Sequence, residues 1–84
     1  MDYPVKTPTQ LGQVLKGIRR HKRILQRDAG RRVGFGQSAV SEFEADPGRA
    51  SVERLFRLLS ALGVDLILRD RSASSPKRRV ADEW

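Results

Sequence analysis

The stretch LQRDAGRRVGFGQSAVSEFE, residues 25–44, decides how the rest of this chain is interpreted. Within it, GFGQSA (residues 34–39) matches G-x-G-x-x-G/A, the glycine pattern with which a backbone approaches a dinucleotide pyrophosphate. The same residues also fit a tight turn followed by the start of a helix that enters DNA. The surrounding sequence separates the two interpretations.

The dinucleotide pattern lacks its structural context. Such a fingerprint needs a strand before the first glycine and an acid about 20 residues later, at the end of a second strand. Here the charged segment RDAGRRV, predicted to be helical, precedes Gly34, and another predicted helix occupies the later region. The chain has only 84 residues, whereas a nucleotide-binding α/β fold needs several βαβ units of about 30 residues each. The nucleotide match is therefore accidental.

The charge of the chain favours a polyanionic partner. The net charge is +7, and residues 16–32 hold eight lysines and arginines against one acid, Asp28. Such a concentration of positive charge attracts polyanions. A run of charges taken alone, however, is about as often an ordinary solvated surface as a binding site. The role of this basic run therefore has to be inferred from the motif next to it.

Several functional classes are excluded by composition. The chain has no cysteine and a single histidine, His21, so it has no material for a disulfide framework, a thiolate zinc site or a Ser-His-Asp triad. We therefore expect no enzymatic activity, no cofactor and no metal. No run approaches the 18 or so apolar residues of a membrane span, and the N-terminus lacks the order of a signal peptide. We expect a cytoplasmic, nucleoid-associated protein.

Apolar periodicity and capping residues predict four helices. The first spans about residues 8–22, with Thr7 and Gln10 forming a capping box, and the second spans 26–33, with Leu25, Ala29 and Val33 on its inner side. The third begins near residue 37 after the turn at Gly34. The fourth is capped by Ser51 and closed by Gly63, and its predicted apolar face holds Val52, Leu55, Phe56, Leu58, Leu59 and Leu62.

The second and third helices, joined by a glycine-containing turn, predict a helix-turn-helix. In such a motif the second helix enters the major groove by its N-terminal residues. Gln37, Ser38 and Ser41 stand at that end and are able to reach base edges or phosphates. A glutamine can pair with N6 and N7 of adenine, so the third helix is predicted to recognise DNA.

In the segment VDLILRD, residues 64–70, the apolar residues Val64, Leu66 and Leu68 recur at every second position, and this period of two predicts a strand at about 64–69. The chain offers this strand no partner, and an unpaired strand edge invites pairing with a second copy. We therefore predict a homodimer that forms through Val64, Leu66, Ile67 and Leu68. The predicted organisation is a flexible arm (1–6), a helix-turn-helix domain with the terminal strand (7–70) and a disordered tail (71–84).

Residues 25–44 resemble the XRE (Cro/C1-type) helix-turn-helix family, whose pattern is roughly T-Q-x-E-L-A-x-x-x-G-(V/I)-S-Q-x-x-(I/V)-S-x-x-E. The matching positions are Gln26, Asp28, Gly34, Gln37, Val40, Ser41 and Glu44. Within that family the chain is most similar to HipB-type antitoxins, through TPTQL, SEFEADP, VDLILRD and the final EW. The likeness covers about residues 7–70, with the end of the tail added.

The resemblance implies a mainly α, four- to five-helix lambda-repressor-like DNA-binding domain, with one C-terminal β-strand that pairs across a homodimer. It also implies a transcriptional repressor that binds a pseudo-palindromic double-stranded DNA operator and neutralises a HipA-like Ser/Thr kinase toxin. Glu44 would pair with Arg19 at the surface, for about 0–1 kcal/mol. Trp84 would dock on the toxin or serve as a degradation handle, or be inert. The candidate DNA-binding residues are Gln26, Arg31, Arg32, Gly36, Gln37, Ser38, Ala39, Ser41 and Glu42.

Several positions depart from the family pattern, and Ala29-Gly30 stands where the pattern has Leu-Ala. Leu25 replaces a capping Ser or Thr worth about 1 kcal/mol, and Gly30 replaces alanine inside a helix at a similar cost. Glu42 places a carboxylate on the recognition helix, where phosphates repel it unless it accepts from a cytosine N4–H. Two alternatives therefore stay open: a toxin-binding adaptor without specific DNA recognition, and a stand-alone XRE-type regulator with no toxin.

Overall fold

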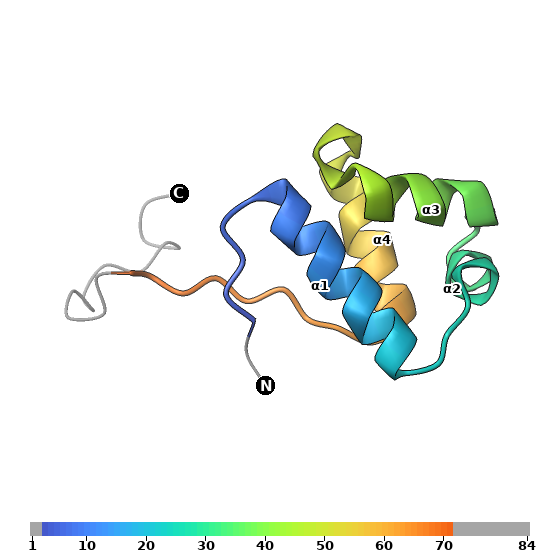
Figure 1. Cartoon of the computed structure of the whole chain (residues 1–84), viewed down its shortest axis with the longest axis horizontal. Coiled ribbons are helices and arrows are strands. Elements are labelled where there is room, and N and C mark those ends of the chain that lie inside the picture. Colours follow the sequence, from blue (N-terminus) through green and yellow to red (C-terminus); the bar gives the residue numbers. More distant parts are fainter. Residues whose placement is uncertain (1–2, 72–84) are drawn as a thin grey trace.

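The computed structural model describes residues 3–71, and this part of the chain is mainly helical (Figure 1). Its elements are α1 (Pro8–His21), α2 (Gln26–Arg32), α3 (Gln37–Ala45), the short 3-10 helix η1 (Pro47–Arg49) and α4 (Val52–Leu62). The predicted number, order and approximate bounds of the helices are confirmed. In Figure 1, α4 lies between α1 and α2, and α3 lies across one side of this group.

The start of α1 differs slightly from the predicted capping box. Thr7 is the N-cap, and its Oγ1 accepts a hydrogen bond from the Gln10 backbone N–H at 3.1 Å, as predicted. The Gln10 side chain, however, accepts from the Lys6 N–H at 2.7 Å instead of reaching back to Thr7. The reciprocal contact therefore holds the residue before the cap, which ties the chain entering α1 to its first turn.

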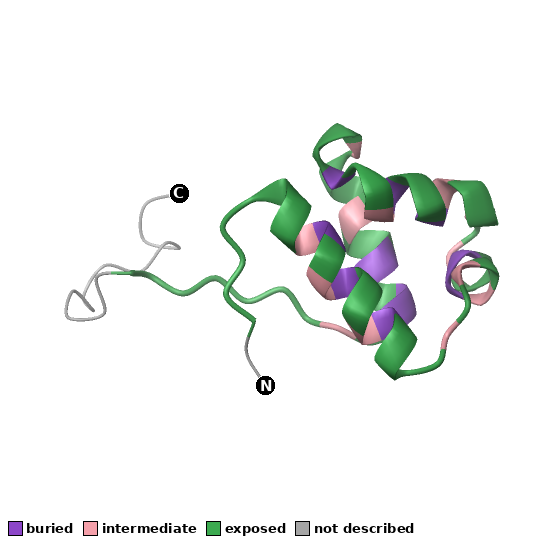
Figure 2. Ribbon diagram, viewed as in Figure 1, coloured by how far each residue is buried: buried purple, intermediate pink, exposed green. Residues whose placement is uncertain are grey.

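The hydrophobic core is built by one apolar stripe from each of the four α-helices. Its buried members are Leu15 of α1, Ala29 of α2, Val40 and Phe43 of α3, and Leu58, Leu59 and Leu62 of α4. Figure 2 shows these buried positions along the inner sides of the helices. The packing holds α3 by its inner side, which leaves the opposite side of α3 in solvent.

Three residues that were predicted to face inward are exposed. Leu25 is 56% exposed because it is the N-cap of α2, in an extended conformation outside the helix. Val52 and Phe56 are 67% and 51% exposed, since they lie one turn apart on the edge of the α4 stripe. The apolar surface of α4 is thus broader than the core that covers it.

The tight turn between α2 and α3 depends on two glycines, Gly34 within the turn and Gly30 in α2. Gly34 has φ +79°, a conformation that side chains rarely adopt. The Phe35 N–H donates to the Gly30 carbonyl at 2.7 Å, and a Cβ atom on Gly30 would lie only 2.5 Å from the Phe35 carbonyl oxygen. The glycine at position 30 thus allows the turn to approach α2 closely, which compensates for its cost inside a helix.

The C-terminal end of α4 is capped by two distant cations. Lys22 Nζ donates to the Leu62 carbonyl at 2.6 Å, and Arg32 Nη1 donates to the Ala61 carbonyl at 2.8 Å. Gly63 closes the helix in the left-handed conformation, with φ +69°. Cations at this end satisfy carbonyls without an intrahelical partner and are favoured by the helix dipole.

After α4, residues 64–70 run past α1 and away from the helices (Figure 1). Val64 is half-buried against the core, whereas Leu66, Ile67 and Leu68 are 46%, 75% and 89% exposed. Within residues 3–71 of this single chain no strand is formed. The predicted strand needs a second protomer as its partner and stays a prediction. Among the same residues, no helix has the length and apolar character required to cross a bilayer.

Candidate nucleic-acid interface

The outer side of α3 presents the residues that were predicted to recognise DNA. Gln37, Ser38, Ser41 and Glu42 are all exposed, as is the N-cap Gly36. In Figure 2 the outer side of α3 is coloured mostly as exposed. They lie on this side because Val40 and Phe43, on the opposite side, are only 1% and 6% exposed in the core. A helix that is anchored by one side and polar on the other is the shape needed to enter a major groove.

Ala39 lies at the edge of this surface. It is half-buried, which agrees with its position between the outer residues and the core residue Val40. A contact to DNA through its methyl group therefore stays a prediction. Its small side chain leaves the N-terminal end of α3 open to an approaching surface.

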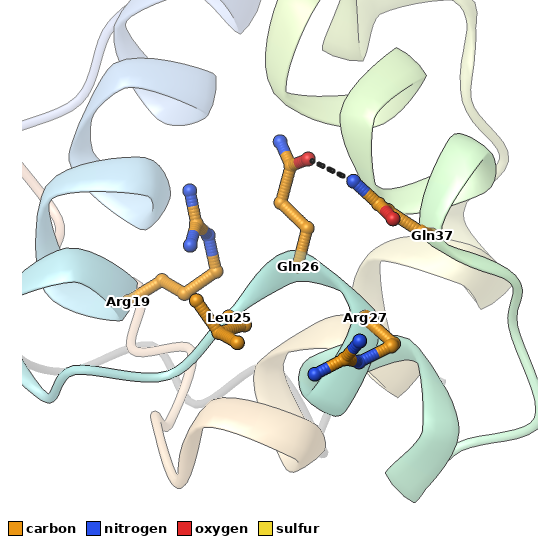
Figure 3. Close-up of a pocket in the computed structure, with 5 residues that line it drawn as sticks. All are labelled: Arg19, Leu25, Gln26, Arg27 and Gln37. Atoms are coloured by element: carbon orange, nitrogen blue, oxygen red, sulfur yellow. Dashed lines mark hydrogen bonds between the residues drawn. The ribbon is translucent and has the colours of Figure 1, made fainter.

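Gln37 is linked by side chains to α2. Its Nε2 donates to Gln26 Oε1 over 3.5 Å, a long hydrogen bond that Figure 3 marks between the two amides. Gln26 Nε2 in turn donates to Glu44 Oε1 at 3.0 Å. Because a carboxylate only accepts, Glu44 sets the amide of Gln26 with its oxygen toward Gln37.

Glu44 belongs to an ion pair that is much less exposed than the sequence suggested. Arg19 Nε donates to Glu44 Oε2 at 2.6 Å and Arg19 Nη2 to Oε1 at 3.2 Å, with side chains only 9% and 4% exposed. Arg19 Nη1 also donates to the Ile24 carbonyl at 2.7 Å. The partners were predicted correctly, but the expectation of a weak surface pair is wrong, since the helices enclose both side chains.

A surface pocket of about 330 Å³ lies beside the two glutamines, where α2 begins (Figure 3). It is lined by Arg19, Leu25, Gln26, Arg27 and Gln37. Arg27 is exposed and makes only a loose contact with Asp28, at 3.8 Å between side chains that are 61% and 42% exposed. It therefore adds an available positive charge next to Gln37 that the sequence analysis did not single out.

The two candidate arginines at the end of α2 differ in their environments. Arg31 is exposed to solvent. Arg32 is exposed too, but its guanidinium donates to the Ala61 carbonyl of α4. The geometry thus gives Arg32 a structural role, which the sequence could not indicate because 29 residues separate the partners.

Phe35, in the turn before α3, has the guanidinium groups of two α4 arginines over its ring. The guanidinium carbons of Arg54 and Arg57 lie 5.5 and 5.7 Å from the centre of its ring. Cations over an aromatic face are attracted to it. This contact fastens the turn to α4 and so helps to fix the N-terminal end of α3.

The predicted tail site cannot be placed. Trp84 and the tail from residue 72 lie outside the described residues. Among residues 3–71, no three His, Cys, Asp or Glu side chains gather as a set of metal ligands. The described chemistry around α2 and α3 is that of amides, hydroxyls, carboxylates and cations.

This geometry defines a class of protein. A family model described as Helix-turn-helix matches residues 7–68, so the chain belongs to the helix-turn-helix family. The matched region contains all four α-helices together with most of the segment predicted to form the terminal strand.

Within that class the chain is similar to proteins named Antitoxin HipB. It is 27% identical over 73 residues to the one from Escherichia coli K12, covering 87% of this chain and 83% of that protein. It is 29% identical over 73 residues to the one from E. coli O6:H1 strain CFT073, covering 87% and 78%. Two solved structures are also similar, each at 25% identity and TM-score 0.80, covering 84% of this chain and all of theirs: the HipB-O4 20mer complex and the HipA-HipB-O2-O3 complex.

Proposed function

We propose that this protein is a homodimeric, sequence-specific DNA-binding repressor that also acts as the antitoxin of a HipA-like kinase toxin. The observation that carries the proposal is the outer side of α3, where exposed Gln37, Ser38 and Ser41 stand on a helix held rigidly by its opposite side. Groove recognition needs this combination of reach and rigidity.

Gln37 is the proposed reader of an adenine. Its Nε2 carries two N–H groups, and only one is directed to Gln26. The other N–H and the side-chain carbonyl remain for N7 and the N6–H of adenine, the pairing that a glutamine makes in the major groove. Because Gln26 is itself oriented by Glu44, the network presents the Gln37 amide in one preferred orientation.

Phosphate contacts supply the affinity in this proposal. Gln26, Arg27 and Arg31 are the candidates on α2, and Ser38 and Ser41 offer hydroxyl groups from α3. Such contacts position the protein without specifying sequence, and the binding they support weakens steeply with salt. Arg32 contributes mainly through its contact with α4.

Dimerisation is proposed to occur through residues 64–69. Leu66, Ile67 and Leu68 are exposed in the single chain, and apolar side chains of this size favour burial. Pairing of two copies of the segment would provide the missing ladder partner and cover these side chains. A two-fold dimer then carries two recognition helices to the two half-sites of a pseudo-palindromic operator.

The antitoxin role is supported by the relatives. Two similar proteins are named Antitoxin HipB, and one similar solved structure is a complex of HipA with HipB. We infer the same pairing here, with a HipA-like kinase encoded beside this protein and a shared operon under its repression. A stand-alone regulator would have no such partner. Co-purification of this protein with the product of the neighbouring gene would therefore distinguish an antitoxin from a stand-alone regulator.

The test is an electrophoretic mobility shift of the purified full-length protein on its own promoter region at moderate salt. A specific, competitor-resistant shift is expected, together with a ternary complex when the toxin is added. The absence of a shift with toxin binding intact would instead support a toxin-binding adaptor. The absence of toxin binding with the shift intact would support a stand-alone regulator.

A further inference from the structure

Glu42 is an exposed acid on a helix that otherwise has no free charge. The sequence of α3, QSAVSEFEA, contains no lysine or arginine, and its other acid, Glu44, is buried against Arg19. Among the described residues, the Glu42 carboxylate has no hydrogen bond or ion pair within the chain. Its acceptor oxygens are therefore available to an external donor.

The position of Glu42 places this carboxylate on the groove-facing arc of α3. At about 100° per residue, Gln37 and Glu42 lie roughly 140° apart around the helix, with Ser38 and Ser41 between them. The inward residues Val40 and Phe43 occupy the other side. Two long side chains thus flank a centre of small ones, which lets the helix approach the floor of the groove closely.

Of the base edges in the major groove, that of cytosine offers a carboxylate the most suitable hydrogen-bond donor. Guanine presents two acceptors and thymine an acceptor and a methyl group, whereas adenine presents its N6 donor beside the N7 acceptor. Cytosine presents the N4 donor without an acceptor beside it on the same base. Resting on the proposed DNA-binding function, we propose that Glu42 is a specificity-determining residue that accepts a hydrogen bond from the N4–H of a cytosine.

The spacing gives the expected position of that cytosine. Five residues of α-helix rise about 7.5 Å, and successive base pairs are about 3.4 Å apart. The cytosine is therefore expected in the same half-site, about two base-pair steps from the adenine that Gln37 contacts.

The experiment is selection from a randomised duplex library with the full-length dimer, followed by affinities for single-base variants of the selected site. The wild type is expected to prefer cytosine at the Glu42 position by about 5- to 150-fold. Glu42→Ala is expected to lose the preference at that position alone, and Glu42→Gln to shift it toward adenine. Glu53→Gln, which removes an exposed carboxylate from α4, is the control and is expected to leave the selected sequence unchanged.

The outcomes separate this assignment from the function on which it rests. A wild-type protein that selects no sequence overturns both. An unchanged motif in Glu42→Ala overturns the assignment alone. A uniform gain in affinity for all sequences in both Glu42 variants also overturns it, because Glu42 would then act only by repelling phosphates.

Discussion

Glu44 of α3 accepts a hydrogen bond from Arg19 Nε of α1 at 2.6 Å, between side chains that are 4% and 9% exposed. The pair joins the first helix to the recognition helix. Through Gln26 it also connects the core of the domain to Gln37. An enclosed ion pair at this place therefore supports both the fold and the orientation of the proposed reading residue.

Arg19→Met is expected to lower the free energy of unfolding by about 3–5 kcal/mol, because it leaves the Glu44 carboxylate buried without its partner. Urea denaturation measures this loss. The control is Glu53→Ala, which breaks the exposed pair of Arg57 and Glu53 and should cost about 0.5 kcal/mol or less. If both variants lose a similarly small part of the free energy of unfolding, the pair of Arg19 and Glu44 behaves as a surface contact.

Gly30→Ala is expected to destabilise the protein by about 1–3 kcal/mol although alanine is the better helix former, since the new methyl group would collide with the Phe35 carbonyl. Gly17→Ala is the matched variant, in the exposed part of α1, where a Cβ atom meets nothing within 4 Å. That change is expected to stabilise the protein by about 0.5–1 kcal/mol. Thermal unfolding of the two variants should therefore shift in opposite directions, and two shifts of the same sign would contradict the steric argument.

Gln37→Ala and Arg31→Ala are expected to weaken DNA binding in different ways. Losing Gln37 should relax the preference at one base pair by about 1–3 kcal/mol of discrimination. Losing Arg31 should weaken binding to all DNA sequences about equally. It should also reduce the slope of log K against log salt concentration by about 1, which corresponds to one fewer released counterion. Binding to matched and single-mismatch operators across a salt series separates them. Uniform weakening in both variants would refute the contact assignment.

Ile67→Pro is expected to yield monomers with much weaker operator binding, because proline removes a backbone N–H from the proposed ladder. Ile67→Val keeps that N–H and a β-branched side chain, so it should remain dimeric. Light scattering of both proteins at equal concentration gives the result. An unchanged dimer in the proline variant would show that residues 64–69 do not form the interface.

The helices of this protein could be predicted from the sequence because their signals are local. Thr7 and Ser51 cap helices by bonding to backbone groups three residues away, and Gly34 and Gly63 adopt the left-handed conformations that end them. The outward position of Gln37, Ser38 and Ser41 follows from the same helical period. These properties depend on neighbours within about one turn, which a sequence displays directly.

The environments of the site residues were decided by contacts between distant parts of the chain. Arg19 and Glu44 are 25 residues apart, so only the packing of α1 against α3 converts their pairing from a surface contact into an enclosed one. Arg32 meets the Ala61 carbonyl 29 residues away, and Leu25 is exposed where periodicity alone placed it inside. A helix's period defines which side chains share a face, but burial and hydrogen-bond partners arise only where another helix covers that face.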